Sequence, residues 1–145
     1  MCYKENMVRL RFAVAAGTAI IGTALVGAAP RPAALVNAAP GQWEIAGLPG
    51  AKAPARQCIS DPIALSQLEH AGRNCSRTII SDTPSSTVVE YNCQAAGFGR
   101  SKMTVITPRS LRIETQGISE GLPFNYVLQA RRVGDCPAKQ TAAAH

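Results

Sequence analysis

The sequence contains few of the residues on which enzyme chemistry depends. Only two histidines occur, His70 and His145. A serine or cysteine nucleophile needs a base beside it, and neither the G-x-S-x-G nor the S-x-x-K motif of hydrolases is present. No C-x-x-C pair occurs, although that spacing is usual in zinc sites. We therefore predict that the chain is not an enzyme, has no catalytic, cofactor-binding or metal-binding residues, and uses no cofactor.

The acidic residues and the one glycine-rich stretch also lack the pattern of a site. Glu44, Glu90 and Glu114 alternate with apolar residues in predicted strands, so they are expected to face water. The Gly97–Arg100 stretch lacks the lysine and helix that follow a phosphate-binding loop, so a bend in a strand is expected. His70 ends a predicted helix, where we expect it to be solvated.

The first 38 residues have the pattern of a secretory signal peptide. Lys4, Arg9 and Arg11 precede 18 uncharged residues, 12–29. Small residues allow cleavage after Ala28 or after Ala38. Translation from Met7 would keep the same pattern.

An uncleaved anchor is the alternative, because 18 residues approach the ~20 that span a bilayer. The run is rich in alanine and glycine and thus only weakly hydrophobic, which favours cleavage. We expect a periplasmic or secreted product without stable membrane insertion.

Removal of this leader lowers the positive charge of the chain. The whole sequence has a formal net charge of +6, whereas residues 39–145 contain 11 Lys and Arg against 8 Asp and Glu, or +3. This charge is ordinary for a small soluble domain. We therefore predict no nucleic-acid binding.

Four cysteines remain after the leader, which contains Cys2. Small exported domains commonly add disulfides to a modest core, so we predict that Cys58, Cys75, Cys93 and Cys136 form two. Four cysteines allow three pairings. We favour Cys58–Cys75, which brackets the predicted helix, together with Cys93–Cys136.

Residues 39–136 are predicted to form a single β-rich domain. Apolar and polar residues alternate in short segments separated by proline and glycine turns. These segments are residues 42–46, 76–81, 87–94, 101–107, 111–116 and 124–133, and residues 56–59 could form a further one. The pattern predicts a mainly β fold: an antiparallel sheet or partly closed barrel of about six short strands with one short helix, stapled by disulfides.

The predicted helix follows Asp61, a capping residue, and Pro62, which is favoured in a first turn. Its apolar face would consist of Ile63, Leu65 and Leu68. Residues 137–145 have no periodicity and are expected to be a disordered tail.

Two further side chains suggest roles in packing or binding. Trp43, the single tryptophan, is expected to anchor the core rather than to bind a ligand. Arg132 has the same parity as the apolar residues Tyr126 and Leu128, which suggests an anion site at the edge of the core.

Several motifs resemble those of a known family. Pro40–Ile45 resembles a P-G-x-W-E opening and Arg131–Cys136 an R-x-G-x-C ending, while Arg56–Ile59, Cys75 and Tyr91–Cys93 occur where the family has its other cysteines. The chain thus resembles domain-of-unknown-function family 3617 of small exported bacterial proteins, although its middle strands contain less Met and Gly. The resemblance implies a β-rich fold and an envelope location, without a reaction or ligand.

The molecular function stays unknown at this point. We expect a non-enzymatic domain that binds a small ligand or an envelope partner. A ligand carrier should enclose an apolar cavity lined by inward-facing residues. The alternative is an inhibitor of secreted hydrolases, which should present a rigid exposed loop, for which Gly117–Pro123 is the candidate.

Overall fold

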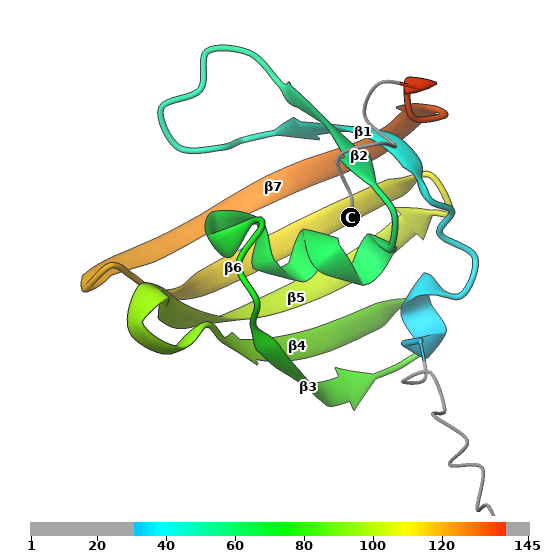
Figure 1. The fold of residues 1–145 in the computed structure, drawn as a ribbon. Coiled ribbons are helices and arrows are strands. Elements are labelled where there is room, and N and C mark those ends of the chain that lie inside the picture. Colours follow the sequence, from blue (N-terminus) through cyan, green and yellow to red (C-terminus); the bar gives the residue numbers. More distant parts are fainter. Residues whose placement is uncertain (1–30, 139–145) are drawn as a thin grey trace, which may run out of the picture.

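A seven-stranded sheet wraps around one helix in the computed structural model, which describes residues 31–138 (Figure 1). In chain order the elements are η1 (Ala33–Leu35), β1 (Gly41–Ala46), β2 (Ala55–Ile59), η2 (Pro62–His70), β3 (Ser76–Asp82), β4 (Ser86–Asn92), η3 (Gln94–Ala96), β5 (Gly97–Thr107), β6 (Ser110–Ser119) and β7 (Leu122–Gly134). The predicted signal sequence through residue 30 and the predicted tail after residue 138 lie outside the described residues. No helix between residues 31 and 138 is long and apolar enough to span a bilayer.

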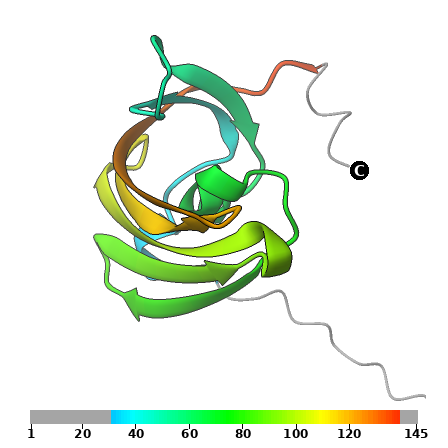
Figure 2. The ribbon, with the colours of Figure 1, turned by 90° about the vertical axis from the view of Figure 1, so that its left-hand side faces the viewer.

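The sheet is antiparallel throughout and open. Its strand order is β2-β1-β7-β6-β5-β4-β3, so β2 and β3 are the two edges. Helix η2 links these opposite edges in sequence, and the sheet curls around it (Figure 2). The predicted mainly β fold with one short helix is confirmed, with seven strands rather than about six. Gly97–Arg100, predicted as a bend or bulge in a strand, forms the start of β5, which is therefore longer than the predicted strand over residues 101–107.

The start of η2 follows from local chemistry. The side chain of Asp61 accepts a hydrogen bond from the backbone N–H of Ile63 at 3.2 Å, and Pro62 occupies the first turn. Leu65 from the predicted apolar face is fully buried, and Ile63 and Leu68 pack against the same core. The predicted cap and apolar face are therefore confirmed.

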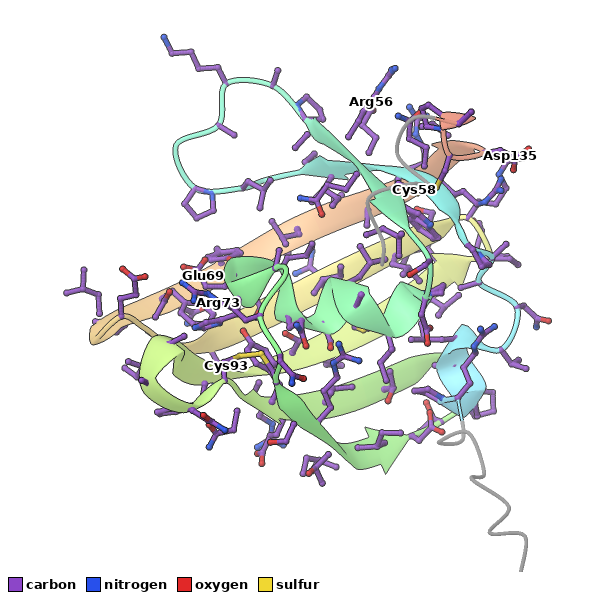
Figure 3. The ribbon with its side chains drawn as sticks, viewed as in Figure 1. Arg56, Cys58, Glu69, Arg73, Cys93 and Asp135 are labelled. Atoms are coloured by element: carbon purple, nitrogen blue, oxygen red, sulfur yellow. A yellow bond between two sulfur atoms is a disulfide. The ribbon has the colours of Figure 1, made fainter. Side chains whose placement is uncertain are left out.

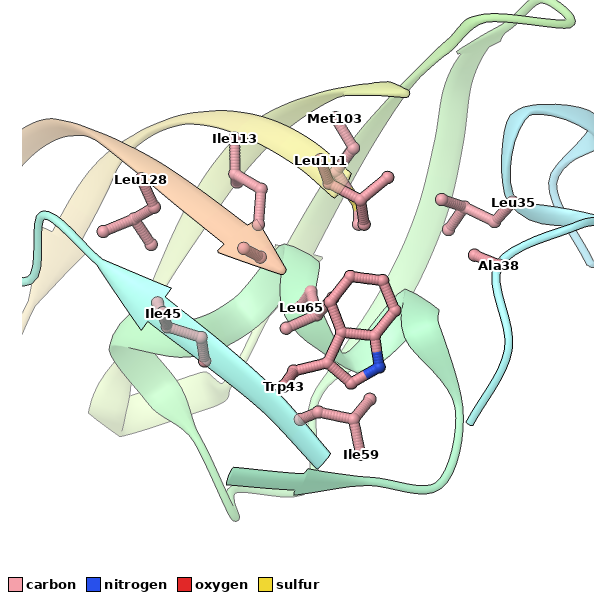
Figure 4. Packing of buried hydrophobic residues seen from close by; sticks show 11 residues of the cluster. Leu35, Ala38, Trp43, Ile45, Ile59, Leu65, Met103, Leu111, Ile113 and Leu128 are labelled. Carbon is pink, nitrogen blue, oxygen red and sulfur yellow. The ribbon is translucent and has the colours of Figure 1, made fainter. Parts of the chain in front are cut away.

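The core lies between η2 and the concave face of the sheet. Alternate residues of each central strand point toward the helix, so the burial pattern has a period of two. Trp43 is completely buried at the centre of this core, as Figure 4 shows. The predicted role of Trp43 as a core anchor is confirmed.

Residues 32–38 also belong to this core. Leu35 and Ala38 are buried in it, and the backbone N–H groups of Ala33 and Ala34 donate to the carboxylate of Asp82, at 2.7 and 3.4 Å. Cleavage after Ala38 would remove this segment from the fold, whereas cleavage after Ala28 would keep it.

All four predicted cysteines form disulfides, but the predicted pairing is wrong. Cys58 is bonded to Cys136, and Cys75 to Cys93. Cys58 lies on edge strand β2 and Cys75 just before the opposite edge strand β3, and each is bonded to a cysteine on its own side of the sheet. Figure 3 shows Cys58 beside Asp135, the residue before its true partner.

Candidate functional site

A groove on the outer, convex face of the sheet is the main candidate site. Strand register brings Glu90, Arg100, Gln116 and Asn125 into one row across β4, β5, β6 and β7. A second row contains Asn92, Phe98 and Ile118. Successive strand residues point to opposite faces, so both rows face away from η2. We call the hollow over these seven residues the outer groove.

The outer groove has the size of a small-molecule site. Its main hollow has a volume of about 680 Å³ and is also lined by Ser76 and Thr78 of the edge strand. A second hollow of about 400 Å³ shares Arg100, Gln116 and Asn125 with it, so the two lie next to each other. Ligand pockets usually measure ≈ 300–1,000 Å³.

Two paired glycines bring the sheet backbone close to aromatic rings on the inner face. Gly99 and Gly117 are register partners, and both line the outer groove. A Cβ on Gly99 would lie 2.5 Å from Cζ of Tyr91, and one on Gly117 would lie 2.8 Å from Cζ of Phe124. The two rings therefore pack directly on the glycine backbone that forms the floor of the groove.

The charges in the groove balance. Glu90 and Arg100 form an ion pair at 3.5 Å, and both side chains are about half exposed. The second hollow adds Lys102 and Glu114, which are register partners on β5 and β6. The ring of Phe98 is the most exposed apolar group in the groove, at 54%.

A second group of polar side chains lies on the inner face, and we call it the inner polar cluster. It consists of Glu69, His70, Tyr91, Ser101, Thr115 and Tyr126. The Ser101 hydroxyl donates to the carbonyl oxygen of Ser66 at 2.5 Å and lies 2.8 Å from the Thr115 hydroxyl. Within residues 31–138 no buried side-chain nitrogen or oxygen lacks a hydrogen-bond partner. The inner polar cluster therefore holds η2 on the sheet.

His70 is buried in this cluster, so the prediction that it is solvated is wrong. Its side chain meets the rings of Tyr91 and Phe124, and the residue is only 4% exposed. Nε2 lies 2.9 Å from the carbonyl oxygen of Ala96, which can only accept, so Nε2 carries a proton. In the neutral ring Nδ1 then accepts from the Tyr91 hydroxyl at 3.4 Å. His70 is buried by Tyr91 of β4 and by Ala96 of η3. Sequence periodicity predicts β4 as a strand, but it does not show that β4 lies against the end of η2.

Burial also perturbs both tyrosines of the cluster. Desolvation raises the pKa of Tyr91 to about 12, with the Thr115 hydroxyl acting in the opposite direction. The pKa of Tyr126 is raised further, by burial and then by the hydrogen bond that its hydroxyl donates to Glu69 at 2.6 Å. Glu69 lies at the end of η2 (Figure 3). Both phenols are therefore neutral in the folded protein at ordinary pH.

The suggested anion site around Arg132 is already occupied by the chain itself. The Arg132 side chain is only 17% exposed, donates to the carbonyl oxygen of Pro40 at 2.7 Å and pairs with Asp135 at 2.6 Å. It lines a hollow of about 420 Å³ with Arg109 and Arg131. Arg132 therefore ties the start of β1 to the segment before Cys136.

The segment Gly117–Pro123, predicted as an exposed loop, is a tight hairpin. Residues 117–119 belong to β6 and residues 122–123 to β7, and their backbones pair. Only Glu120 and Gly121 form the turn, with φ of 49° and 83°, as expected for a two-residue hairpin. The exposed part of this segment is thus limited to the tip of the hairpin, residues 120–123.

Sequence reasoning placed Glu90 and Glu114 on the water-facing side, but it did not find the outer groove. Strand parity could have identified Phe98, Arg100, Gln116 and Asn125 as outward-facing. Their assembly depends on β5 extending through residues 97–100, which lie before the strand predicted over residues 101–107.

Comparisons with curated proteins and with solved structures find no match. A family model described as "Protein of unknown function (DUF3617)" matches residues 38–136, which is most of the chain and nearly all of the described domain. The chain therefore belongs to the DUF3617 family.

Proposed function

We propose that this chain is an exported, non-enzymatic domain that binds a ligand in the outer groove. The observation that carries the proposal is the pair of adjacent hollows over β4 to β7, which combine an exposed aromatic residue with polar side chains that have no hydrogen-bond partner in the described part of the protein. The concave face, where a carrier cavity was expected, is filled by η2 and the core.

Two features support the non-enzymatic part of the proposal. Both ring nitrogens of His70 have partners inside the protein, so the ring is not presented to a substrate. Among the described residues, no three His, Cys, Asp or Glu side chains gather as metal ligands would.

Export is supported by the basic and apolar leader pattern of residues 1–29 and by two disulfides, which persist in oxidising compartments. A periplasmic or secreted location fits both features.

Nuclear magnetic resonance of the processed domain tests the groove. The small-molecule fraction of a bacterial envelope extract is titrated into ¹⁵N-labelled protein, and shifts should concentrate at amides of β4 to β7 that line the groove. Phe98→Ala should abolish these shifts. Ile106→Ala is the matched control, because Ile106 is 60% exposed on β5 but outside the groove. Shifts that are absent, or that survive Phe98→Ala, would reject the groove as the binding site.

A further inference from the structure

We propose that the ligand of the outer groove is a neutral oligosaccharide. This inference rests on the proposed function, since it names the ligand class for the same site. Three properties of the groove support it: its charge, its polar groups and its shape.

The balance of charge argues against an ionic ligand. Glu90 and Arg100 neutralise each other, and the second hollow is lined by one further charge of each sign, Lys102 and Glu114. Glu114 also pairs with Arg112 at 3.3 Å. A phosphate or a polyanion would gain from Arg100 only by displacing Glu90, which would stay close to the anion and repel it. An uncharged ligand can bind without breaking the ion pair.

The side-chain amides of the groove are able to hydrogen-bond the hydroxyl groups of a sugar. Gln116 and Asn125 are register partners on β6 and β7 and both line the groove, and neither side chain forms a hydrogen bond within residues 31–138. Each primary amide offers both a donor and an acceptor. Adjacent hydroxyls of a sugar ring present the same pair of functions, so one amide can bind two neighbouring hydroxyls.

Phe98 provides the apolar surface that a sugar also needs. Its ring is 54% exposed and lies beside Ile118 in the second row. The face of an aromatic ring carries partial negative charge. One face of a pyranose ring presents mainly C–H groups, whose hydrogens are slightly positive, so the sugar can stack on Phe98 while its hydroxyls meet the amides.

The shape of the groove favours a chain of sugars over a single ring. The hollows of about 680 and 400 Å³ are neighbours that share Arg100, Gln116 and Asn125, and both lie on the open outer face. A linear oligosaccharide can occupy both hollows, with one ring on Phe98 and the next near the two amides.

A titration with defined probes tests the ligand class. Cellotetraose, maltotetraose and chitotetraose are added separately to ¹⁵N-labelled protein, alongside inorganic phosphate, tetragalacturonate and an uncharged tetrapeptide. At least one neutral sugar should cause saturable chemical-shift changes at the backbone amides of Phe98, Gln116 and Asn125. Phe98→Tyr should retain binding, whereas Phe98→Leu, which keeps apolar volume but loses the ring, should weaken it about tenfold or more. Asn125→Ala should also weaken it, and Ile106→Ala should not.

The other possible results reject either the neutral oligosaccharide as the ligand class or the outer groove as a binding site. Groove binding by the anionic probes or the peptide, without any neutral sugar, would overturn the ligand class but leave the groove as a binding site. Absence of binding by every neutral sugar overturns the sugar proposal. If the envelope fraction also leaves the groove amides unchanged, the proposed function fails with it.

Discussion

At the scale of single residues, Gly99 shows how the absence of a side chain shapes the groove. We predict that Gly99→Ala lowers the free energy of unfolding by about 1–3 kcal/mol, a typical effect of overpacking. The added Cβ would lie 2.5 Å from Cζ and 2.9 Å from Cε1 of Tyr91. The Tyr91 ring cannot easily move away, because it is buried and its hydroxyl is hydrogen-bonded to Nδ1 of His70. Urea unfolding followed by Trp43 fluorescence measures the change. Gly134→Ala is the control, since no atom lies within 4 Å of its added Cβ. Equal stabilities of the two variants would contradict the prediction.

The buried phenols of Tyr91 and Tyr126 predict a loss of stability in alkali. Their pKa values in the folded protein lie above the ordinary tyrosine value of about 10, and that of Tyr91 is raised to about 12. Below pH 10 both states hold the proton, so the stabilisation is complete. Between pH 10 and 12 the unfolded chain releases these protons first, so stability falls as pH rises through this window. Equilibrium unfolding at a series of pH values should show that the free energy of unfolding falls between pH 10 and 12. In a Tyr91→Phe/Tyr126→Phe variant the free energy of unfolding should fall less steeply with pH. An identical slope in the variant would exclude these phenols as the cause.

At the scale of elements, the segment before β1 is predicted to be necessary for stability. A chain starting at Ala39 loses Leu35, which is fully buried, and both backbone hydrogen bonds to Asp82. We expect it to be less stable than a chain starting at Ala29 by at least the ~2–5 kcal/mol of a Leu→Ala core substitution. Thermal unfolding of both chains gives the difference. Leu35→Ala should reproduce most of the loss, whereas Val36→Ala, at a side chain 62% exposed, should have little effect.

The same packing leads us to propose cleavage after Ala28 rather than Ala38. Intact-mass analysis of the protein from the envelope fraction should give a chain that begins at Ala29. A chain that begins at Ala39 and is as stable as the longer form would contradict both the processing site and the role of residues 32–38.

An element could be predicted from the sequence when the interactions that form it join residues close together in the chain. The start of η2 was predictable because Asp61 and Pro62 act on the first turn itself. The strands were predictable from period-two alternation, as in Val89 and Tyr91 of β4. The burial of His70 was not, because its partners Tyr91 and Ala96 lie 21 and 26 residues away.

At the scale of the whole molecule, the order of the strands was the information that the sequence pattern lacked. Alternation shows which residues share a face, but not which strands are neighbours. The pairing of β1 with β7 joins the two ends of the domain, and η2 carries the chain from one edge of the sheet to the other. Both the disulfide pairing and the outer groove depend on this order, and neither could be assembled without it.

The two disulfides are predicted to stabilise the fold unequally. Cys58–Cys136 closes a separation of 78 residues and holds the end of β7 near edge strand β2, whereas Cys75–Cys93 closes 18 residues beside the β3–β4 pair. In the chain-entropy model the longer loop contributes about 4.5 kcal/mol and the shorter about 3 kcal/mol. Guanidinium unfolding should therefore show a larger loss for Cys58→Ala/Cys136→Ala than for Cys75→Ala/Cys93→Ala.

Peptide mapping of the non-reduced protein checks the pairing on which this difference depends. A peptide linking Cys58 to Cys136 is expected, because Gln42 of β1 pairs with Cys58 on one side and with Gly134 on the other. The chain then needs only two more residues to bring Cys136 across the end of β1 to Cys58. A Cys58–Cys75 peptide would require the two edges of the sheet to meet, and would therefore contradict the strand order itself. Equal losses in the two double variants, with the expected peptides present, would instead reject loop length as the source of the stabilisation.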